Sequence, residues 1–114
     1  MTILYGISNC DTVRKARKWL TAHHIEYHFH DVRKDGLDSK MLKHWERETD
    51  WETLLNRRGT TWRKLDDETK TSINKTSAIQ LMLEEPTLIK RPVLQHKNKI
   101  TVGFNESTYS SIFC

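Results

Sequence analysis

The first thirty residues change their hydrophobic pattern twice, and these changes limit the folds that are open to the chain. Residues 2–6 form a short apolar run that ends at a glycine, which is typical of a buried strand. From Asp11 to about His23 the apolar residues recur every three or four positions, which predicts an amphipathic helix. Residues 25–30 then alternate between apolar and polar side chains, as a half-buried strand does. The chain therefore opens with a strand, a helix and a second strand.

The second half of the chain supplies the rest of a sheet. A strand–helix–strand unit crosses over with a right hand, so its two strands pair in parallel. Residues 93–96 and 100–102 predict a hairpin of two short strands, and a final short helix follows a cap at Asn105 and ends at Phe113. We therefore expect an α/β fold with a four-stranded mixed sheet, flanked by helices on both faces in the thioredoxin-like arrangement.

A block of helices separates the two halves of the predicted sheet. Its pieces are, in order, a polar turn over 31–36, a helix over 37–48, a short helical piece over 51–56, an irregular loop over 57–61, a turn of helix over 66–70 and a helix over 77–85 that ends at Pro86. A length of 114 residues is the usual size of one domain. We therefore expect residues 1–114 to form a single domain with a helical insertion at about 37–85.

Composition and charge narrow the class of function. The formal charge is +4, but nineteen basic residues are interspersed with fifteen acidic ones, which favours a mixed solvated surface over a nucleic-acid interface. No apolar stretch is long enough for a membrane helix, and the N-terminus does not resemble a secretory signal. The six histidines show no third ligand near His28 and His30 that would complete a zinc site. We expect a monomeric cytoplasmic protein that binds no metal and has no membrane partner.

Cys10 stands where the first predicted helix begins, in a polar turn. The unpaired N–H groups and the dipole of a helix start favour a thiolate, so the thiol pKa is expected to fall from about 8.5 toward roughly 3.5 to 7.5. Arg14, one helical turn further on, is expected to add a positive charge, and Asn9 and Thr12 are expected to surround the sulfur. A buried, inert cysteine is the alternative. The polar neighbours Asn9 and Asp11 argue against it.

Only one thiol is available in this turn. A Cys-x-x-Cys redox pair would need a second cysteine at position 13, where Val13 stands. An oxidised Cys10 must therefore be resolved by an outside thiol such as glutathione, or by Cys114 if the tail reaches it. Because terminal residues are usually mobile, we interpret Cys114 as incidental.

Arg91 and Pro92 stand immediately before a predicted strand. A proline at the start of a strand places no demand on the hydrogen-bond ladder, and its peptide bond is a candidate for the cis form. Backbone exposed at this point is expected to pair with an extended peptide such as glutathione, while Arg91 binds a carboxylate or an oxyanion. An ordinary surface arginine is the alternative.

Three segments carry a family resemblance: residues 5–16 (YGISNCDTVRKA), residues 54–65 (LLNRRGTTWRKL) and residues 89–92 (IKRP). Together and in this order they resemble the arsenate reductase (ArsC) family, and within it the YffB branch, which is related to the regulator Spx. The resemblance covers nearly the whole chain. It implies a thioredoxin-like fold with a helical insertion, a nucleophilic cysteine at Cys10, and an arginine before a proline at Arg91-Pro92.

The sequence departs from the family pattern at informative places. Arsenate reductases that work with glutaredoxin hold the oxyanion with two further arginines, at positions that align with Asn56 and Gly103. Neither residue is an arginine here, although Arg57 or Arg58 could substitute. Regulators of the Spx type carry a Cys-x-x-Cys switch, which Val13 interrupts.

The residues and the resemblance together lead to one hypothesis and two alternatives. The hypothesis is a thiol reductase with no bound cofactor, in which Cys10 attacks an oxidised thiol and glutathione is the co-substrate. Arg91 and either Arg57 or Arg58 would bind a carboxylate of glutathione, with glutaredoxin or an oxidised protein thiol as further partners. The first alternative is an arsenate reductase coupled to glutathione or glutaredoxin. The second is a non-enzymatic adaptor that binds RNA polymerase.

Overall fold

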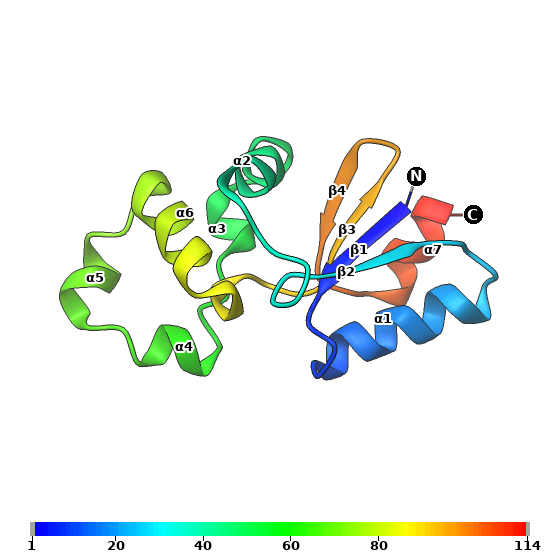
Figure 1. Cartoon of the computed structure of the whole chain (residues 1–114), viewed down its shortest axis with the longest axis horizontal. Coiled ribbons are helices and arrows are strands. Elements are labelled where there is room, and N and C mark those ends of the chain that lie inside the picture. The colour runs from blue at the N-terminus through cyan, green and yellow to red at the C-terminus, as the bar shows by residue number, and fades with distance from the viewer. Residues whose placement is uncertain (1, 114) are drawn as a thin grey trace. The chain divides into compact units, whose positions relative to one another are not determined.

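A computed structural model describes residues 2–113, so the predicted role of Cys114 lies outside the described residues. The chain divides into two compact units (Figure 1). The first consists of the residues up to Asp35 together with those from Arg91 onward, and it contains the sheet. The second, Gly36–Lys90, is helical, and the insertion expected at about 37–85 lies within it. The assignment of one domain stays a prediction.

The first unit is built on a four-stranded mixed sheet in the order β2-β1-β3-β4. The strands are β1 (Thr2–Gly6), β2 (His28–Asp31), β3 (Val93–His96) and β4 (Lys99–Val102). β1 pairs in parallel with β2 and antiparallel with β3, while β3 and β4 form the hairpin. Leu4 lies opposite both Phe29 and Leu94. The predicted mixed sheet is confirmed.

The second strand begins three residues later than expected, at His28 rather than at Ile25. The reason lies at the end of α1 (Asp11–Ala22). His24 has a φ of 58°, and the N–H of Ile25 donates to the carbonyl of Leu20 at 3.0 Å, so Ile25 closes the helix instead of joining the ladder. The predicted face is correct all the same, since the side chains of Ile25, Tyr27 and Phe29 all pack against one core.

The hairpin turn is one residue shorter than expected. Lys97 and Asn98 have φ values of 50° and 66°, as the two central residues of a type I′ turn require. β4 therefore begins at Lys99 instead of Ile100.

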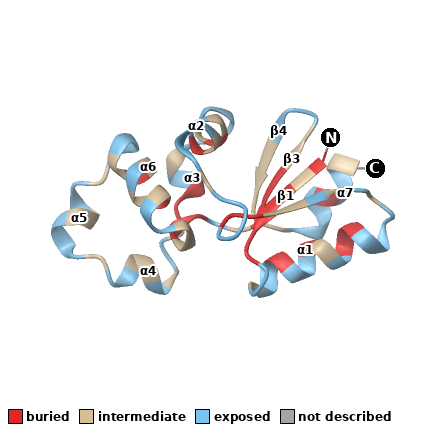
Figure 2. Cartoon of the chain, in the orientation of Figure 1, coloured by how far each residue is buried: buried red, intermediate tan, exposed pale blue. Residues whose placement is uncertain are grey.

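The predicted helices that flank the sheet are confirmed, and those of this unit pack on one face of it. The buried core contains Ala16, Trp19 and Leu20 of α1 together with Tyr109 of α7 (Glu106–Phe113). These side chains meet the same strand residues, Leu4 and Leu94, which point to the same side. Figure 2 shows the buried positions along β1, β3 and α1. The predicted cap of α7 is confirmed, because Asn105 accepts a hydrogen bond from the N–H of Thr108.

The second unit contains the helical pieces of the insertion. They are α2 (Ser39–Glu48), α3 (Trp51–Leu54), α4 (Thr60–Arg63), α5 (Asp67–Thr71), α6 (Lys75–Glu84) and the 3-10 helix η1 (Pro86–Leu88). α6 begins two residues earlier than predicted, because Asn74 and Ser77 exchange the two hydrogen bonds of a capping box. The loop expected over residues 57–61 ends earlier, at Gly59, which is the N-cap residue of α4. Among the described helices, none has the length and apolar character needed to cross a membrane.

Candidate active site around Cys10

Cys10 lies in a tight turn between β1 and α1. Its N–H donates to the carbonyl of Ile7 at 3.2 Å, and its own carbonyl accepts the N–H of Arg14 at 3.0 Å, so Cys10 is the N-cap residue of α1. The helix passes close to the strand here. A Cβ on Gly6 would lie 2.8 Å from Cγ2 of Val13, which explains the glycine at the end of β1.

The Cys10 thiol is half-buried and lies in an electropositive environment. Burial raises its pKa, but the N–H of Val13, then the hydrogen bond and positive charge of Arg91, and then the N–H of Thr12 lower it more. The net pKa is below that of an ordinary cysteine, in the predicted direction. The side chain does not form a full capping hydrogen bond. The two N–H groups therefore act on the thiolate as partial positive charges at the start of the helix.

Arg91 is the cation beside the sulfur. It is half-buried, and the peptide bond between Arg91 and the buried Pro92 is cis. The carbonyl of Pro92 accepts the N–H of Gly103 at 2.8 Å, which ties this segment to the chain after β4. The pairing of a peptide ligand with this segment stays a prediction.

Arg91 is the cation that lowers the pKa of Cys10, and the part expected of Arg14 stays a prediction. The guanidinium of Arg14 forms an ion pair with the carboxylate of Asp11, and both side chains are largely exposed. Thr12 acts on Cys10 through its backbone N–H. Asn9 is exposed in the turn, and its place beside the sulfur stays a prediction.

Asp31 is a residue of this site that the sequence analysis missed. It ends β2 opposite Gly6 and is buried, with 5% of its surface exposed. Its carboxylate accepts the N–H groups of Arg33 at 2.9 Å and Lys34 at 3.2 Å. Burial raises the pKa of Asp31, but hydrogen bonds from the N–H groups of Arg33, Lys34 and Ser8 and the charge of Lys34 lower it more, so it lies below the ordinary value.

The contact between Asp31 and Ser8 joins the end of β2 to the turn that presents Cys10. In the sequence Asp31 is the first residue of a polar turn, where aspartate is common for local reasons. The only available signal was its place at the end of a strand that pairs in parallel with β1, because the carboxyl ends of parallel strands lie together.

Arg57 and Arg58 belong to the second unit, so their part in substrate binding stays a prediction. The guanidinium of Arg57 lies over the rings of Trp51, 5.9 Å from the centroid, and Trp62, at 5.6 Å. The N–H of Arg58 donates to the side-chain oxygen of Asn56 at 3.1 Å.

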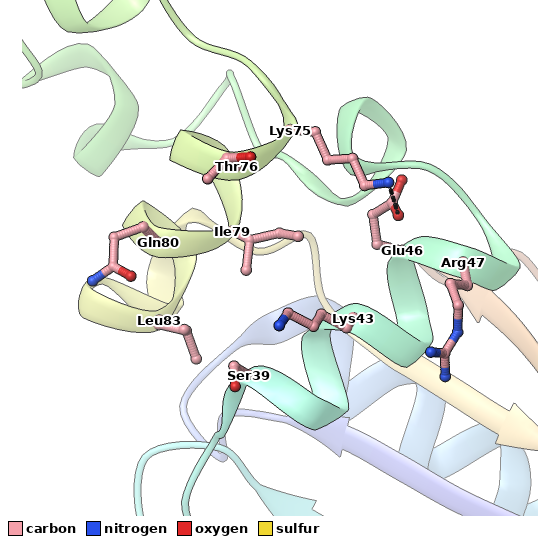
Figure 3. Close-up of a pocket in the computed structure, with 9 residues that line it drawn as sticks. All are labelled: Ser39, Lys43, Glu46, Arg47, Lys75, Thr76, Ile79, Gln80 and Leu83. Carbon is pink, nitrogen blue, oxygen red and sulfur yellow. Dashed lines mark ion pairs between the residues drawn. The ribbon is translucent and has the colours of Figure 1, made fainter.

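A hollow of about 520 Å³ lies between α2 and α6 of the second unit (Figure 3). Ile79 and Leu83 line it on the side of α6, and Lys75 forms an ion pair with Glu46 at 3.4 Å. None of the site residues predicted from the sequence lines this hollow, as far as residues 2–113 are described. Between residues 2 and 113, no three His, Cys, Asp or Glu side chains are grouped as metal ligands would be.

Comparison with known sequences gives a consistent set of matches. The ArsC family model matches residues 5–112. A protein of unassigned function from Haemophilus influenzae is 50% identical over 113 residues, which cover 99% of both chains. The global transcriptional regulator Spx of Streptococcus mutans is 28% identical over 110 residues, which cover 93% of this chain and 78% of the regulator.

Comparison with solved structures agrees. A structure of a YFFB protein is 45% identical and covers all of both chains, with a TM-score of 0.95. The solution structure of an arsenate reductase (ArsC) related protein from Brucella melitensis is 46% identical, covers 98% of this chain and 93% of its own, and has a TM-score of 0.81. The fold described above is therefore shared along nearly the whole chain.

Proposed function

The chain belongs to the ArsC family and has the thioredoxin-like fold predicted for it, and on this basis we propose that it is a glutathione-dependent thiol reductase. The observation that carries the proposal is the position of Cys10, which is partly exposed at the start of α1. Arg91 and the N–H groups at the start of that helix lower the pKa of its thiol. A thiolate is the nucleophilic form of cysteine.

The proposed reaction consists of three successive thiol–disulfide exchanges. The Cys10 thiolate attacks one sulfur of a substrate disulfide; a bond from Cys10 to that sulfur forms, the substrate S–S bond breaks, and the leaving thiolate takes a proton from water. A glutathione thiolate then attacks the Cys10 sulfur, which releases the second substrate thiol. A second glutathione attacks the glutathione held on Cys10, restores the Cys10 thiolate and leaves as oxidised glutathione. One substrate disulfide is reduced while two glutathione molecules are oxidised.

The predicted site residues have distinct parts in this proposal. Arg91 stabilises the thiolate and also binds a glutathione carboxylate, which a guanidinium holds well. Asn9 and Thr12 form the rim around the sulfur, and Arg57 or Arg58 adds a second carboxylate contact. We place the reaction in the cytoplasm, where glutathione keeps thiols reduced.

The test measures turnover and thiol titration on the same protein. The mixed disulfide of glutathione and 2-mercaptoethanol serves as substrate, with excess glutathione, glutathione reductase and NADPH to record turnover. We expect Cys10→Ser to abolish turnover, and alkylation of the wild-type protein at graded pH to give a Cys10 titration midpoint below the usual value of about 8.5. A midpoint at or above that value, or full turnover by Cys10→Ser, would contradict the proposal.

Arsenate reduction is the second candidate, and the relative from Brucella melitensis favours it by its description. In that reaction the Cys10 thiolate would attack arsenate, so that a sulfur–arsenic bond forms and hydroxide leaves. A glutathione thiolate would then attack the Cys10 sulfur, forming a disulfide while the sulfur–arsenic bond breaks and arsenic leaves with two more electrons as arsenite. Asn56 and Gly103 argue against it, because the resemblance places them where reductases of this kind have the two arginines that hold the oxyanion. Arsenite formation from arsenate, glutathione and glutaredoxin distinguishes the two reactions.

An adaptor role is the third candidate, and it rests on the match to Spx. An adaptor acts through its surface and does not need the thiol. If Cys10→Ser leaves the cellular phenotype intact while charge reversals on the surface abolish it, the adaptor role replaces the enzymatic one.

A further inference from the structure

A second hollow, of about 730 Å³, lies along α1 in the same unit as Cys10. Its lining begins at Asp11, the residue after Cys10, and reaches Ala22 at the other end of the helix. With a rise of about 1.5 Å per residue, this stretch of helix is about 16 Å long. The lining of the hollow therefore begins one residue after the proposed nucleophile and runs along α1 away from it.

Half of the residues that line this hollow are cationic. Arg14, Lys15, Arg17 and Lys18 line it, with Asp11 as the one acidic residue among the lining side chains, so four positive charges and one negative charge leave a net charge of +3. The charge of Asp11 is already used by its ion pair with Arg14. Lys15 and Lys18 are exposed and lie three residues apart, on one side of the helix.

One of these cations is held in place by the neighbouring segment. The Nε–H of Arg17 donates to the hydroxyl of Tyr27 at 3.1 Å, and its guanidinium lies 4.2 Å from the ring centroid of Phe29. A side chain fixed in this way loses less conformational freedom when it binds an anion. The hollow thus combines a prearranged guanidinium with two exposed ammonium groups.

We propose that this basic groove, defined by Arg14, Lys15, Arg17, Lys18 and Tyr27, binds an acidic stretch of the polypeptide whose disulfide is reduced at Cys10. The inference rests on the proposed function and adds the substrate class to it. An extended chain covers about 3.3 to 3.6 Å per residue, so the groove spans about five residues. A polypeptide is favoured over a nucleic acid because the groove begins one residue from the proposed thiolate, and a polypeptide can carry a disulfide whereas a nucleic acid cannot.

The kinetic test compares peptides that differ only in charge. Two peptides each carry one cysteine as a mixed disulfide with glutathione, with five residues on both sides that are rich in Glu and Asp in one peptide and in Lys in the other. We expect kcat/KM for the acidic peptide to exceed that for the basic peptide about tenfold at low salt, and the ratio to shrink in 0.5 M NaCl. A ratio of one at low salt would contradict the proposal that the groove binds acidic peptides.

Matched charge reversals locate the effect. In the double variant Lys15→Glu, Lys18→Glu the ratio should fall to one or below. The control reverses Lys97 and Lys99 of the exposed β3–β4 hairpin, which do not line the groove, and should keep the wild-type ratio. Because each ratio is measured on one protein, a change in the reactivity of Cys10 cancels. Equal ratios in the two double variants would overturn the groove.

A binding measurement separates this inference from the proposed function. The acidic peptide with serine in place of cysteine and a fluorescent label is titrated with full-length protein, and its Kd is measured by anisotropy. The Kd should rise at least fivefold in Lys15→Glu, Lys18→Glu and stay unchanged in the hairpin control. An equal Kd in both variants would overturn the groove, whereas the absence of turnover with every disulfide would overturn only the proposed reaction.

Discussion

The guanidinium of Arg91 lies within hydrogen-bonding reach of the Cys10 sulfur, although the two residues come from opposite ends of the sequence. The pairing of β1 with β3 brings them together. Tyr5, near the end of β1, lies opposite Val93 at the beginning of β3, so the turn after β1 and the segment before β3 meet at the same edge of the sheet. The activation of the thiol therefore depends on a long-range strand pairing as well as on the helix start.

Arg91→Gln should slow the alkylation of Cys10 at pH 7 by about three- to tenfold, because a charge-assisted hydrogen bond to the thiolate is lost. The iodoacetamide reaction followed by mass spectrometry measures this rate. Arg14→Gln is the matched control and should leave it nearly unchanged, since Arg14 pairs with Asp11. Equal slowing in both variants would show that Arg91 has no special place beside the sulfur.

The stability of the reduced protein should depend on pH through Cys10. The pKa of Cys10 is lower in the folded protein than in the unfolded chain, so between these two pKa values the unfolded state binds more protons. The free energy of unfolding should rise with pH across that window, and the gain should be lost as pH falls through the folded pKa. The contribution of Cys10 to the free energy of unfolding should stay below about 1 kcal/mol because the thiol is partly exposed. Urea denaturation of the wild type and of Cys10→Ser at a series of pH values measures this contribution. If the free energies of unfolding of the two proteins change with pH in parallel, the prediction is wrong.

Asp31→Ala should lower the free energy of unfolding by about 2 kcal/mol, because the N–H groups of Arg33 and Lys34 lose a charged acceptor. The same change should loosen Ser8 and raise the Cys10 pKa. Asp31→Asn keeps an acceptor oxygen and should lie between wild type and Asp31→Ala in both quantities. Urea denaturation and the pH profile of alkylation measure the two effects; a thiol titration unchanged in Asp31→Ala would show that Asp31 does not position the turn.

Gly6→Ala should destabilise the protein by about 1 to 3 kcal/mol, because the added methyl group would lie 2.8 Å from Cγ2 of Val13. Val13→Ala removes that carbon. The double variant should therefore be more stable than the sum of the two single losses indicates. A double-mutant cycle from urea denaturation measures the coupling, and simple additivity would argue against the close approach of α1 to β1.

Tyr109→Phe should leave the protein as stable as the wild type or increase its free energy of unfolding by about 1 kcal/mol. The hydroxyl of Tyr109 is buried and has no hydrogen-bond partner among the described residues, and burial raises its pKa. Phenylalanine fills the same space and leaves no polar atom unpaired. Thermal and urea denaturation test this, and a loss above about 1 kcal/mol would reveal a partner for the hydroxyl.

Local sequence patterns predicted most of the helices and strands, but few of the residues at which they begin and end. β1, α1 and the cap of α7 followed from periodicity and a single capping residue. The first residue of β2 was not predicted correctly, because the N–H of Ile25 donates to the carbonyl of Leu20. The alternation of side chains does not show where the hydrogen-bonded ladder begins. The expected loop over 57–61 failed at Thr60, since glycine and hydroxyl residues also begin helices.

The sequence by itself determined that Cys10 is a thiol at a helix start, because the N–H groups of Thr12 and Val13 that act on it lie within three residues of it. Only the tertiary structure decided which cation and which carboxylate belong to the site. Arg14 is near in sequence but pairs with Asp11, whereas Arg91 reaches the sulfur because β3 pairs with β1. Asp31 reaches Ser8 because β2 pairs with β1 in parallel. The sequence predicted that pairing, but aspartate is common in polar turns for local reasons, so nothing local marked Asp31 as the residue that contacts Ser8.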